Sequence, residues 1–234
     1  MTEPIITSDP EIKATAILRK YMDLSKLLDL LYSNDLYFRR ADGFSDRLEG
    51  ALFPSLRKLI DESHLKGDIK YNSDEFYRSA REDNYVSCWS IGARDNMALW
   101  QLYGDTKTSV VITTTLDRIV NAFDWDRSIH IHKVKYVDHK KIRNYIIGAP
   151  REVLQYKSDA YGFEKELRIV APHQDKDDDS MGVRMPLKNI NSLIRSVVVA
   201  PDADISFVKA VSDLCKRYGL TTPIRRSKLS FVLK

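Results

Sequence analysis

Hydrophobic residues recur at helical spacing in several parts of the chain. Leu24, Leu27, Leu28 and Leu31 recur at helical spacing, so this stretch predicts an amphipathic helix. Asp23 or Ser25 is its expected N-cap. The same spacing predicts an earlier helix within residues 10–33 that contains Ile17, Leu18 and Tyr21. It also predicts helices at residues 51–64, 73–82, 95–103, 116–123, 138–147, 151–158 and 205–218.

Other stretches are continuously apolar or alternate between apolar and polar residues, which predicts strands. In residues 129–137, His130 and His132 share one face, which we expect to be half exposed. Two histidines at this spacing can chelate a metal, but the sequence offers no third ligand. The remaining predicted strands are residues 36–40, 84–90, 109–113, 161–170, 183–187, 194–199 and 229–233. Helices and strands together predict an α+β fold.

No Pro/Gly/Ser-rich linker divides the 234 residues, so we expect a single domain over 1–234 with N-terminal helices in 1–33 and a mixed core in 34–234. The apolar content of 43% and charged content of 30% are typical of a globular protein, and no apolar run is long enough to cross a membrane. The first residues do not resemble a secretory signal, so the cytoplasm is the expected location.

Charge and cysteine content restrict the chemistry only slightly. A net charge of +4 is compatible with an anionic ligand or nucleic acid but argues for neither. Cys88 and Cys215 are the only cysteines, and their separation excludes a disulfide framework and a metal-ligand spacing. Cys88 lies in an apolar strand and is expected in the core.

The segment Tyr161–Val170 combines an apolar face with a row of ionisable groups. As a strand it places Phe163 among the core residues, and Glu164, Glu166 and Arg168 together on the opposite face. Such a row lies either on a solvent-exposed edge strand or in a functional site. Arg168 is expected to pair with a glutamate and keep it ionised.

Four motifs resemble those of a large bacterial family known only as a domain of unknown function. They are Leu-Arg-Lys-Tyr at 18–21, Phe-Ser-Asp-Arg-Leu-Glu at 44–49, Trp-Gln-Leu-Tyr at 100–103 and Glu-Lys-Glu-Leu-Arg at 164–168. Ser45 and Arg47 stand where that family has Asn and Pro. This resemblance names relatives but no reaction.

The order of motifs is also similar to that of the ADP-ribosyltransferase fold in its Arg, Ser, Glu version. Tyr37–Arg40 matches the strand with a terminal basic residue, Ser87–Ser90 matches the Ser-x-Ser strand with one residue too many, and Glu164–Glu166 matches Glu-x-Glu. A competing alignment gives Trp89 and Trp100 the place of two tyrosines that sandwich nicotinamide. The resemblance implies a bent, split antiparallel sheet with peripheral helices.

The same resemblance implies NAD as the substrate and gives roles to individual residues. Glu166 would stabilise the oxocarbenium-like sugar, and Glu164 would orient or deprotonate an acceptor. The residues expected to hold NAD are Arg39 or Arg40, Ser87 or Ser90, and the aromatic residues Trp89, Trp100 and Tyr103, of which the last two share a helix face. The acceptor would be a protein or nucleic acid, in a toxin or phage-defence system that can include a neutralising partner protein.

Two other functions remain open. A metal-dependent nuclease or nucleic-acid-binding module would use carboxylates for a divalent ion, namely Asp46, Glu49, Glu164 and Glu166. A non-catalytic interaction domain predicts that Arg168 or Arg40 is buried against the two glutamates with no cavity beside them.

Overall fold

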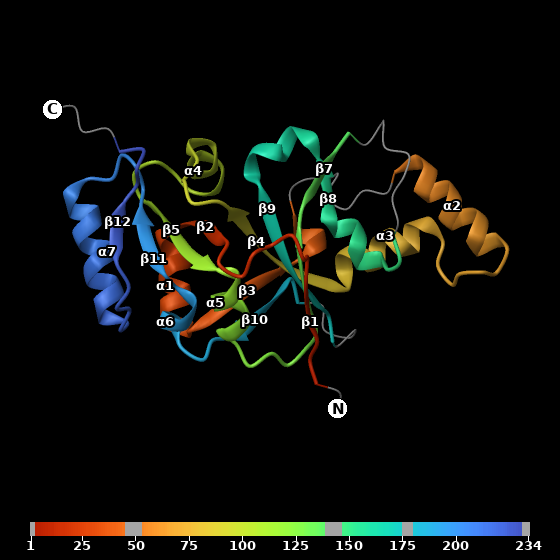
Figure 1. The fold of residues 1–234 in the computed structure, drawn as a ribbon, viewed down its shortest axis with the longest axis horizontal. Coiled ribbons are helices and arrows are strands. Elements are labelled where there is room, and N and C mark those ends of the chain that lie inside the picture. Colours follow the sequence, from red (N-terminus) through yellow and green to blue (C-terminus); the bar gives the residue numbers. More distant parts are fainter. Residues whose placement is uncertain (1–2, 45–52, 139–146, 175–179, 231–234) are drawn as a thin grey trace. The chain divides into compact units, whose positions relative to one another are not determined.

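The computed structural model describes residues 3–44, 53–138, 147–174 and 180–230, and it contains both helices and strands (Figure 1). The predicted α+β class is confirmed. The chain forms two compact units. Unit 1 consists of Met1–Asp9, Phe38–Cys88 and Asp126–Val183, and unit 2 of Pro10–Tyr37, Trp89–Trp125 and Arg184–Lys234. The single domain over 1–234 stays a prediction.

The strands of unit 1 form a mixed sheet. Its neighbouring strands are β1 (Ile6–Ser8), β6 (Ile129–Lys133), β9 (Glu166–Pro172) and β4 (Asn84–Ile91), in that order. Strand β3 (Asp35–Arg40) also pairs with β4, and β10 (Gly182–Pro186) pairs with β3. The β6–β9 pairing is antiparallel but β1–β6 is parallel, so the sheet is not purely antiparallel as expected. A separate parallel pair consists of β7 (Lys135–Val137) and β8 (Tyr156–Ser158).

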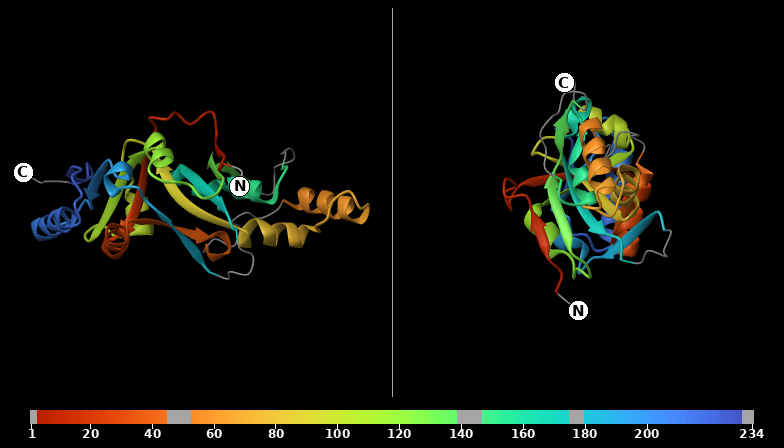
Figure 2. Two further views of the ribbon diagram at one scale, coloured as in Figure 1. Left: turned by 90° about the horizontal axis from the view of Figure 1, so that it is seen from below. Right: turned by 90° about the vertical axis from the view of Figure 1, so that its right-hand side faces the viewer.

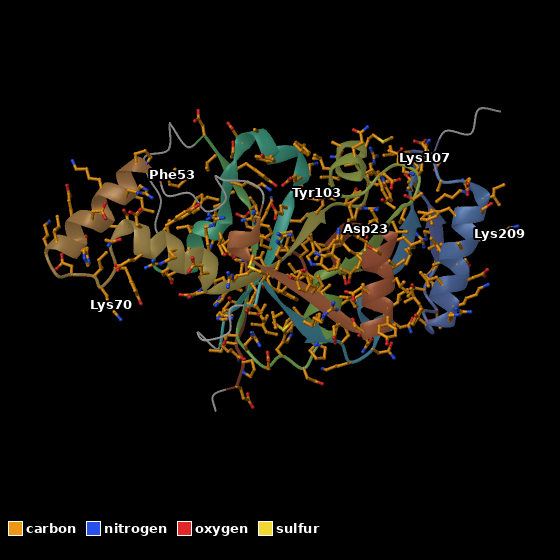
Figure 3. All side chains as sticks on the ribbon, turned by 180° about the vertical axis from the view of Figure 1, so that it is seen from behind. Asp23, Phe53, Lys70, Tyr103, Lys107 and Lys209 are labelled. Atoms are coloured by element: carbon orange, nitrogen blue, oxygen red, sulfur yellow. The ribbon has the colours of Figure 1, made fainter. Side chains whose placement is uncertain are left out.

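Helices of unit 1 pack around a small apolar core. Helix α2 (Pro54–Leu65) begins with Pro54 in its first turn, as predicted, and α3 (Ser73–Glu82) begins at a capping box made by Asn72 and Glu75. Phe53 precedes α2 (Figure 3) and contacts the ring of Tyr156 edge-on. The 3₁₀ helices of this unit are η1 (Ala41–Gly43), η2 (Pro150–Gln155) and η3 (Asp159–Glu164).

Unit 2 contains the second group of strands. Its neighbouring strands are β2 (Ile17–Asp23), β5 (Ser109–Thr115), β11 (Ser196–Val199) and β12 (Ile224–Arg226), and β2 also pairs with the end of β4. Its helices are α1 (Leu24–Ser33), α4 (Met97–Tyr103), α5 (Leu116–Asn121), α6 (Ile190–Leu193) and α7 (Ile205–Arg217). Helix α7 lies next to β11 and β12 (Figures 1 and 2). Asp23 caps α1 (Figure 3).

The predicted helix that contains Ile17, Leu18 and Tyr21 is wrong, because Ile17–Asp23 is strand β2. All seven residues of β2 pair with β5, and Leu18 and Met22 are buried on one face with period two. Pairing with a neighbour therefore outweighs a short run that is also compatible with helical spacing.

Several smaller expectations are corrected too. The predicted helix at 151–158 is instead the 3₁₀ helix η2 followed by strand β8, and the predicted strand at 129–137 divides into β6 and β7. The last described strand is β12 (Ile224–Arg226). Of the strand predicted at 229–233, Leu229 and Ser230 do not belong to a strand, and 231–233 lie outside the described residues. The predicted helix at 138–147 also falls mostly on residues that are not described, 139–146.

The cap of α4 differs from the expected Asp95. Asn96 is the N-cap, and its side-chain oxygen accepts a hydrogen bond from the amide of Ala98 at 2.9 Å. Asp95 instead accepts a hydrogen bond from the hydroxyl of Ser227. Within the described ranges, no helix is both long and apolar enough to cross a membrane.

Candidate active site

The Glu-x-Glu segment is not one continuous strand. Helix η3 ends at Glu164, Lys165 adopts a left-handed conformation with φ of 47°, and β9 begins at Glu166. A left-handed conformation is unusual for a lysine, and it redirects the chain between the two glutamates. The strand predicted over 161–170 is therefore wrong before Glu166, and Phe163, predicted in the core, is 38% exposed.

Four charged side chains of unit 1 nevertheless meet, and we call Lys157, Glu164, Glu166 and Arg168 the buried charge cluster. The ammonium of Lys157 lies 2.6 Å from Glu164 Oε2 and 3.2 Å from Glu166 Oε2. The guanidinium of Arg168 donates to both oxygens of Glu166, from Nε at 2.9 Å and from Nη2 at 3.1 Å. The predicted pairing of Arg168 with a glutamate is confirmed.

All members of the buried charge cluster are at most 6% exposed to solvent. The exposed fractions are 6% for Lys157, 4% for Glu164, 6% for Glu166 and 0% for Arg168. The interpretation as an edge strand exposed to water is therefore wrong. Two positive and two negative groups balance one another, which is the condition under which buried charges are tolerated.

Glu166 is ionised despite its burial. Burial raises the pKa of its carboxyl, but the charge and hydrogen bonds of Arg168, the charge of Lys157 and a hydrogen bond from Cys88 lower it to about 2. The backbone amide of Glu166 also donates to the hydroxyl of Tyr136 at 2.8 Å. Burial raises the pKa of Tyr136 to about 12, so this phenol stays protonated at neutral pH.

Three groups around Glu166 were not expected from the sequence. Lys157 lies in a segment predicted as helix, with its ammonium 4.7 Å from the centre of the Tyr161 ring. Tyr136 lies in a segment outside the motifs, and Cys88 was expected in the core without a polar role. The signal available in the sequence was weak: Lys157 directly follows the aromatic residue Tyr156.

Strands β4 and β3 bring some of the predicted site residues to the face of Glu166 and leave others on the opposite face. Cys88 and Val86 alternate with Ser87 along β4, and Arg39 lies directly opposite Val86. Cys88 and Val86 belong to one apolar cluster with Val170, which shares the face of Glu166 on β9. Strand alternation thus favours Arg39 as the arginine on the face of Glu166.

Ser87 and Arg40 lie on the other face. Ser87 is 1% exposed, and Arg40 lies opposite Tyr85 in the pairing of β3 with β4. Arg40 donates to Asp42, from Nε to Oδ1 at 2.9 Å and from Nη2 to Oδ2 at 3.0 Å. The structure therefore does not bring Arg40 and Ser87 to the face that carries Glu166.

The other predicted site residues belong to unit 2. Ser90 lies opposite Arg19 in the pairing of β2 with β4. Trp89 is 2% exposed, and Trp100 is fully buried against Tyr21, with ring centres 5.2 Å apart. Tyr103 is 47% exposed, so Trp100 and Tyr103 do not share an open surface. These four residues keep their predicted roles only as proposals.

A pocket of about 450 Å³ lies in unit 1, with His130, His132 and Val170 in its wall. His132 is opposite Arg168 in the β6–β9 pairing and is 8% exposed, so the half-exposed position expected for it is wrong. Burial and the charge of Arg168 lower the pKa of His132 to about 4, and its ring donates to the carbonyl of Leu154. Nε2 of this neutral ring has no hydrogen-bond partner in the part of the chain described.

The structure gives no metal centre among the residues that it describes, where no three histidine, cysteine, aspartate or glutamate side chains are grouped as ligands. Glu164 and Glu166 bind Lys157 and Arg168 instead. Asp46 and Glu49, the other two carboxylates of the nuclease interpretation, lie outside the described residues.

No family model matches the chain, so membership of the bacterial family of unknown function stays a prediction. A search of curated proteins gives no match either.

Three solved structures of Thermus sp. 2.9 DarT are similar to the chain at low scores. The complex with ADP-ribosylated ssDNA has 8% identity and a TM-score of 0.42, and the similarity covers 93% of this chain and 96% of that chain. The carba-NAD+ complex has 10% identity and a TM-score of 0.41, with 94% and 98% covered. The NAD+ complex has 8% identity and a TM-score of 0.43, with 94% and 100% covered. All three TM-scores are below 0.5.

Proposed function

We propose that the protein is an NAD-dependent ADP-ribosyltransferase in which Glu166 is the catalytic carboxylate. The observation that carries the proposal is the state of Glu166, a buried carboxylate with a pKa of about 2, fixed by Arg168 and Lys157. Burial of an ionised carboxylate in a fixed position lowers the stability of a folded protein. Such carboxylates are common at sites where positive charge develops during a reaction.

The proposed reaction begins with cleavage of the bond between nicotinamide and ribose. Nicotinamide leaves with the bonding electron pair, and the sugar becomes an oxocarbenium ion. Glu166 stabilises this cation more than it stabilises neutral ribose, which lowers the barrier. The buried charge cluster has no net charge, so its long-range field is weak. The stabilisation of the cation therefore comes from the carboxylate oxygen of Glu166 that lies next to the sugar, in a position fixed before the reaction.

The acceptor then supplies the electron pair for the new bond to the sugar. Glu164, which shares Lys157 with Glu166, is proposed to orient the acceptor and receive its proton. Arg39 is proposed to hold a phosphate or ribose of NAD and is favoured over Arg40. Of the two serines, Ser90 is favoured over Ser87. Ser90, Trp89, Trp100 and Tyr103 remain proposed contacts to NAD.

The wider role rests on the motif order alone. We propose a macromolecular acceptor, protein or nucleic acid, and a place in a bacterial toxin or phage-defence system that includes a neutralising partner protein. The expected location is the cytoplasm. Incubation of the protein and a cell lysate with NAD labelled in its adenylate half identifies the fraction that takes up label.

The test of the catalytic residue is nicotinamide release by Glu166→Gln, which keeps the size of the side chain and removes its charge. We expect a loss of roughly 10²–10³-fold in turnover with NAD binding retained. Glu82→Gln is the matched control because Glu82 is an exposed carboxylate of unit 1. Thermal unfolding must show that both variants are folded. A folded Glu166→Gln protein that releases nicotinamide at the wild-type rate would overturn the assignment.

A second candidate, a non-catalytic interaction domain, is favoured by the complete burial of Arg168 against Glu166. A charge-balanced pair is often replaceable by apolar residues without loss of stability. The double variant Glu166→Met with Arg168→Met separates the two functions. An interaction domain keeps its partner binding in this variant, whereas the enzyme loses nicotinamide release even though it folds.

A further inference from the structure

We propose that a pocket in unit 2 binds a phosphate group. The pocket has a volume of about 230 Å³, and its wall carries five basic side chains and one acidic side chain. These are Arg19, Arg195, Arg225, Arg226, Lys228 and Asp95. We call it the basic pocket. It shares no residue with the buried charge cluster, and the inference does not rest on the proposed transferase activity.

Arg19 is the fixed point of the basic pocket. It is only 9% exposed, and its Nε donates to the carbonyl of Gly92 at 3.0 Å while Nη2 donates to that of Ala93. Nη1 is buried and has no hydrogen-bond partner among the described residues. A buried donor on a charged group without an acceptor is costly, so this nitrogen indicates where an anionic acceptor binds.

The strand register explains why further donors gather beside Arg19. Arg19 on β2 lies opposite Thr113 on β5, and Thr113 lies opposite Ser196 on β11. Residues directly opposite each other share a sheet face, and the two hydroxyl oxygens are 2.7 Å apart. On the next strand, Arg225 of β12 lies opposite Val198, two residues beyond Ser196. One face of four neighbouring strands thus carries arginines and hydroxyls.

Within the described residues, the wall of the basic pocket has a large excess of positive charge. Asp95 is the one acidic side chain in the wall, and it accepts a hydrogen bond from Ser227. Over residues 3–44, 53–138, 147–174 and 180–230, none of the five basic side chains forms an ion pair. Several like charges around one small space repel unless an anion binds between them, and arginine matches phosphate geometry.

The size of the basic pocket restricts the ligand. Pockets that enclose whole drug-sized ligands measure roughly 300–1,000 Å³. At about 230 Å³ the basic pocket lies below this range, and it has room for a phosphate group together with part of the molecule that carries it. A terminal phosphate with two negative charges fits better than a phosphodiester with one. Such a group occurs at the end of a nucleic-acid strand and on small metabolites, and the experiment separates these sources.

The probes are inorganic phosphate, adenosine monophosphate, and one oligonucleotide with either a 5′-phosphate or a 5′-hydroxyl. Binding is measured by titration calorimetry at fixed salt concentration, because affinity for polyanions falls as salt increases. We expect the 5′-phosphate to improve binding of the strand at least about tenfold, since charge-assisted hydrogen bonds are the stronger ones. Binding of the two small probes without such an improvement supports the same site with a small metabolite as its source.

The double variant Arg195→Glu with Arg225→Glu reverses two exposed charges in the pocket wall. We expect it to lose the preference for phosphorylated probes. Lys209→Glu with Lys216→Glu is the matched control, because it reverses two exposed charges of unit 2 on helix α7 and is expected to keep the preference. Lys209 is labelled in Figure 3. Equal loss in both double variants would mean that only the overall charge matters, and would overturn the proposal.

Two further results would also overturn it, namely no binding of any phosphorylated probe by the wild-type protein, and displacement of the bound probe by NAD. The second would assign the pocket to NAD itself. Both outcomes are distinguishable from failure of the proposed transferase, because nicotinamide release by the wild-type protein is measured separately. Glu166→Gln is expected to keep phosphate binding.

Discussion

The buried charge cluster of unit 1 and the basic pocket of unit 2 both place arginine on a β-strand, but they differ in charge balance. Arg168 is fully buried and forms a two-oxygen ion pair with Glu166, next to Lys157 and Glu164. Arg19 is almost as buried, yet within the described residues it donates to the backbone carbonyls of Gly92 and Ala93, and its Nη1 has no hydrogen-bond partner.

This difference separates charged groups that stabilise the fold by pairing with one another from charged groups that are available to bind a ligand. In the buried charge cluster each charge is stabilised by its oppositely charged neighbours. Removal of one charge therefore leaves another charge buried without a partner, which lowers the stability of the fold. In the basic pocket the charges repel each other, so removal of one relieves repulsion. The same kind of substitution is therefore expected to have opposite effects on stability in the two regions.

The largest effect is expected from Lys157→Met, which removes the ammonium between the two glutamates. Glu164 then loses the ion pair with Lys157, and the cluster keeps two negative charges against one positive charge. We expect a loss of about 3–5 kcal/mol in the free energy of unfolding, measured with urea at pH 7. Lys133→Met is the control, because Lys133 is an exposed lysine in the same unit. A loss below about 1 kcal/mol would mean that water reaches the cluster.

The double variant Lys157→Met with Glu164→Gln sharpens this result. It removes one positive and one negative charge, so Glu166 and Arg168 remain as a balanced pair. We expect it to recover roughly 1–3 kcal/mol of the stability lost in Lys157→Met, as the coupling between contacting residues. The single variant Glu164→Gln completes the comparison. If the stability losses of Lys157→Met and Glu164→Gln add up to the loss of the double variant, the contact of 2.6 Å between Lys157 and Glu164 contributes no interaction energy.

His132 allows a test by pH. Its pKa in the folded protein is about 4, below the roughly 6.5 of an unfolded histidine. A lowered pKa stabilises the fold at neutral pH, and this contribution is lost as the pH falls from about 6.5 through about 4. The difference corresponds to an upper value of roughly 3 kcal/mol. His132→Asn, whose amide can still donate to Leu154, is expected to lose less stability than the wild type between pH 7 and pH 4.5, in urea unfolding.

The acidic end of that pH range involves a different group. Glu166 has a lowered pKa of about 2, so its contribution is present above about pH 4.5 and disappears only as the pH falls toward 2. A pH dependence between 7 and 4.5 that is identical in His132→Asn and the wild type would show that His132 does not carry it.

Capping residues and the spacing of apolar residues predicted the helices and strands whose signals lie within their own segment. Helix α3, strand β4 and the start of α1 at Asp23 lie where caps and periodicity put them. Strand β2 was not predicted because its seven residues obtain their conformation from pairing with β5, a partner about ninety residues away in sequence. Long-range pairing is not visible in the periodicity of a short segment.

The candidate site shows the same limit. The prediction grouped Glu164, Glu166 and Arg168 correctly, although it assumed a single strand that the left-handed Lys165 interrupts. Lys157 was missed because the pairing of β7 with β8 and the turn of η3, rather than any sequence motif, bring it to the glutamates. Arg19 was missed as a site residue because its segment was predicted to be a helix.

The smallest effect on stability is expected from Arg195→Gln with Arg225→Gln in the basic pocket. Both side chains are exposed and unpaired within the described structure, so the substitutions break no ion pair. Relief of repulsion should leave the free energy of unfolding unchanged or raise it by at most about 0.5 kcal/mol at low salt. Added phosphate should stabilise the wild-type protein, since a ligand that binds only the folded state raises its stability, and should have no such effect on this variant. A destabilisation of the variant similar to that of Lys157→Met would mean that these arginines support the fold rather than bind a ligand, and the contrast between the two regions would be lost.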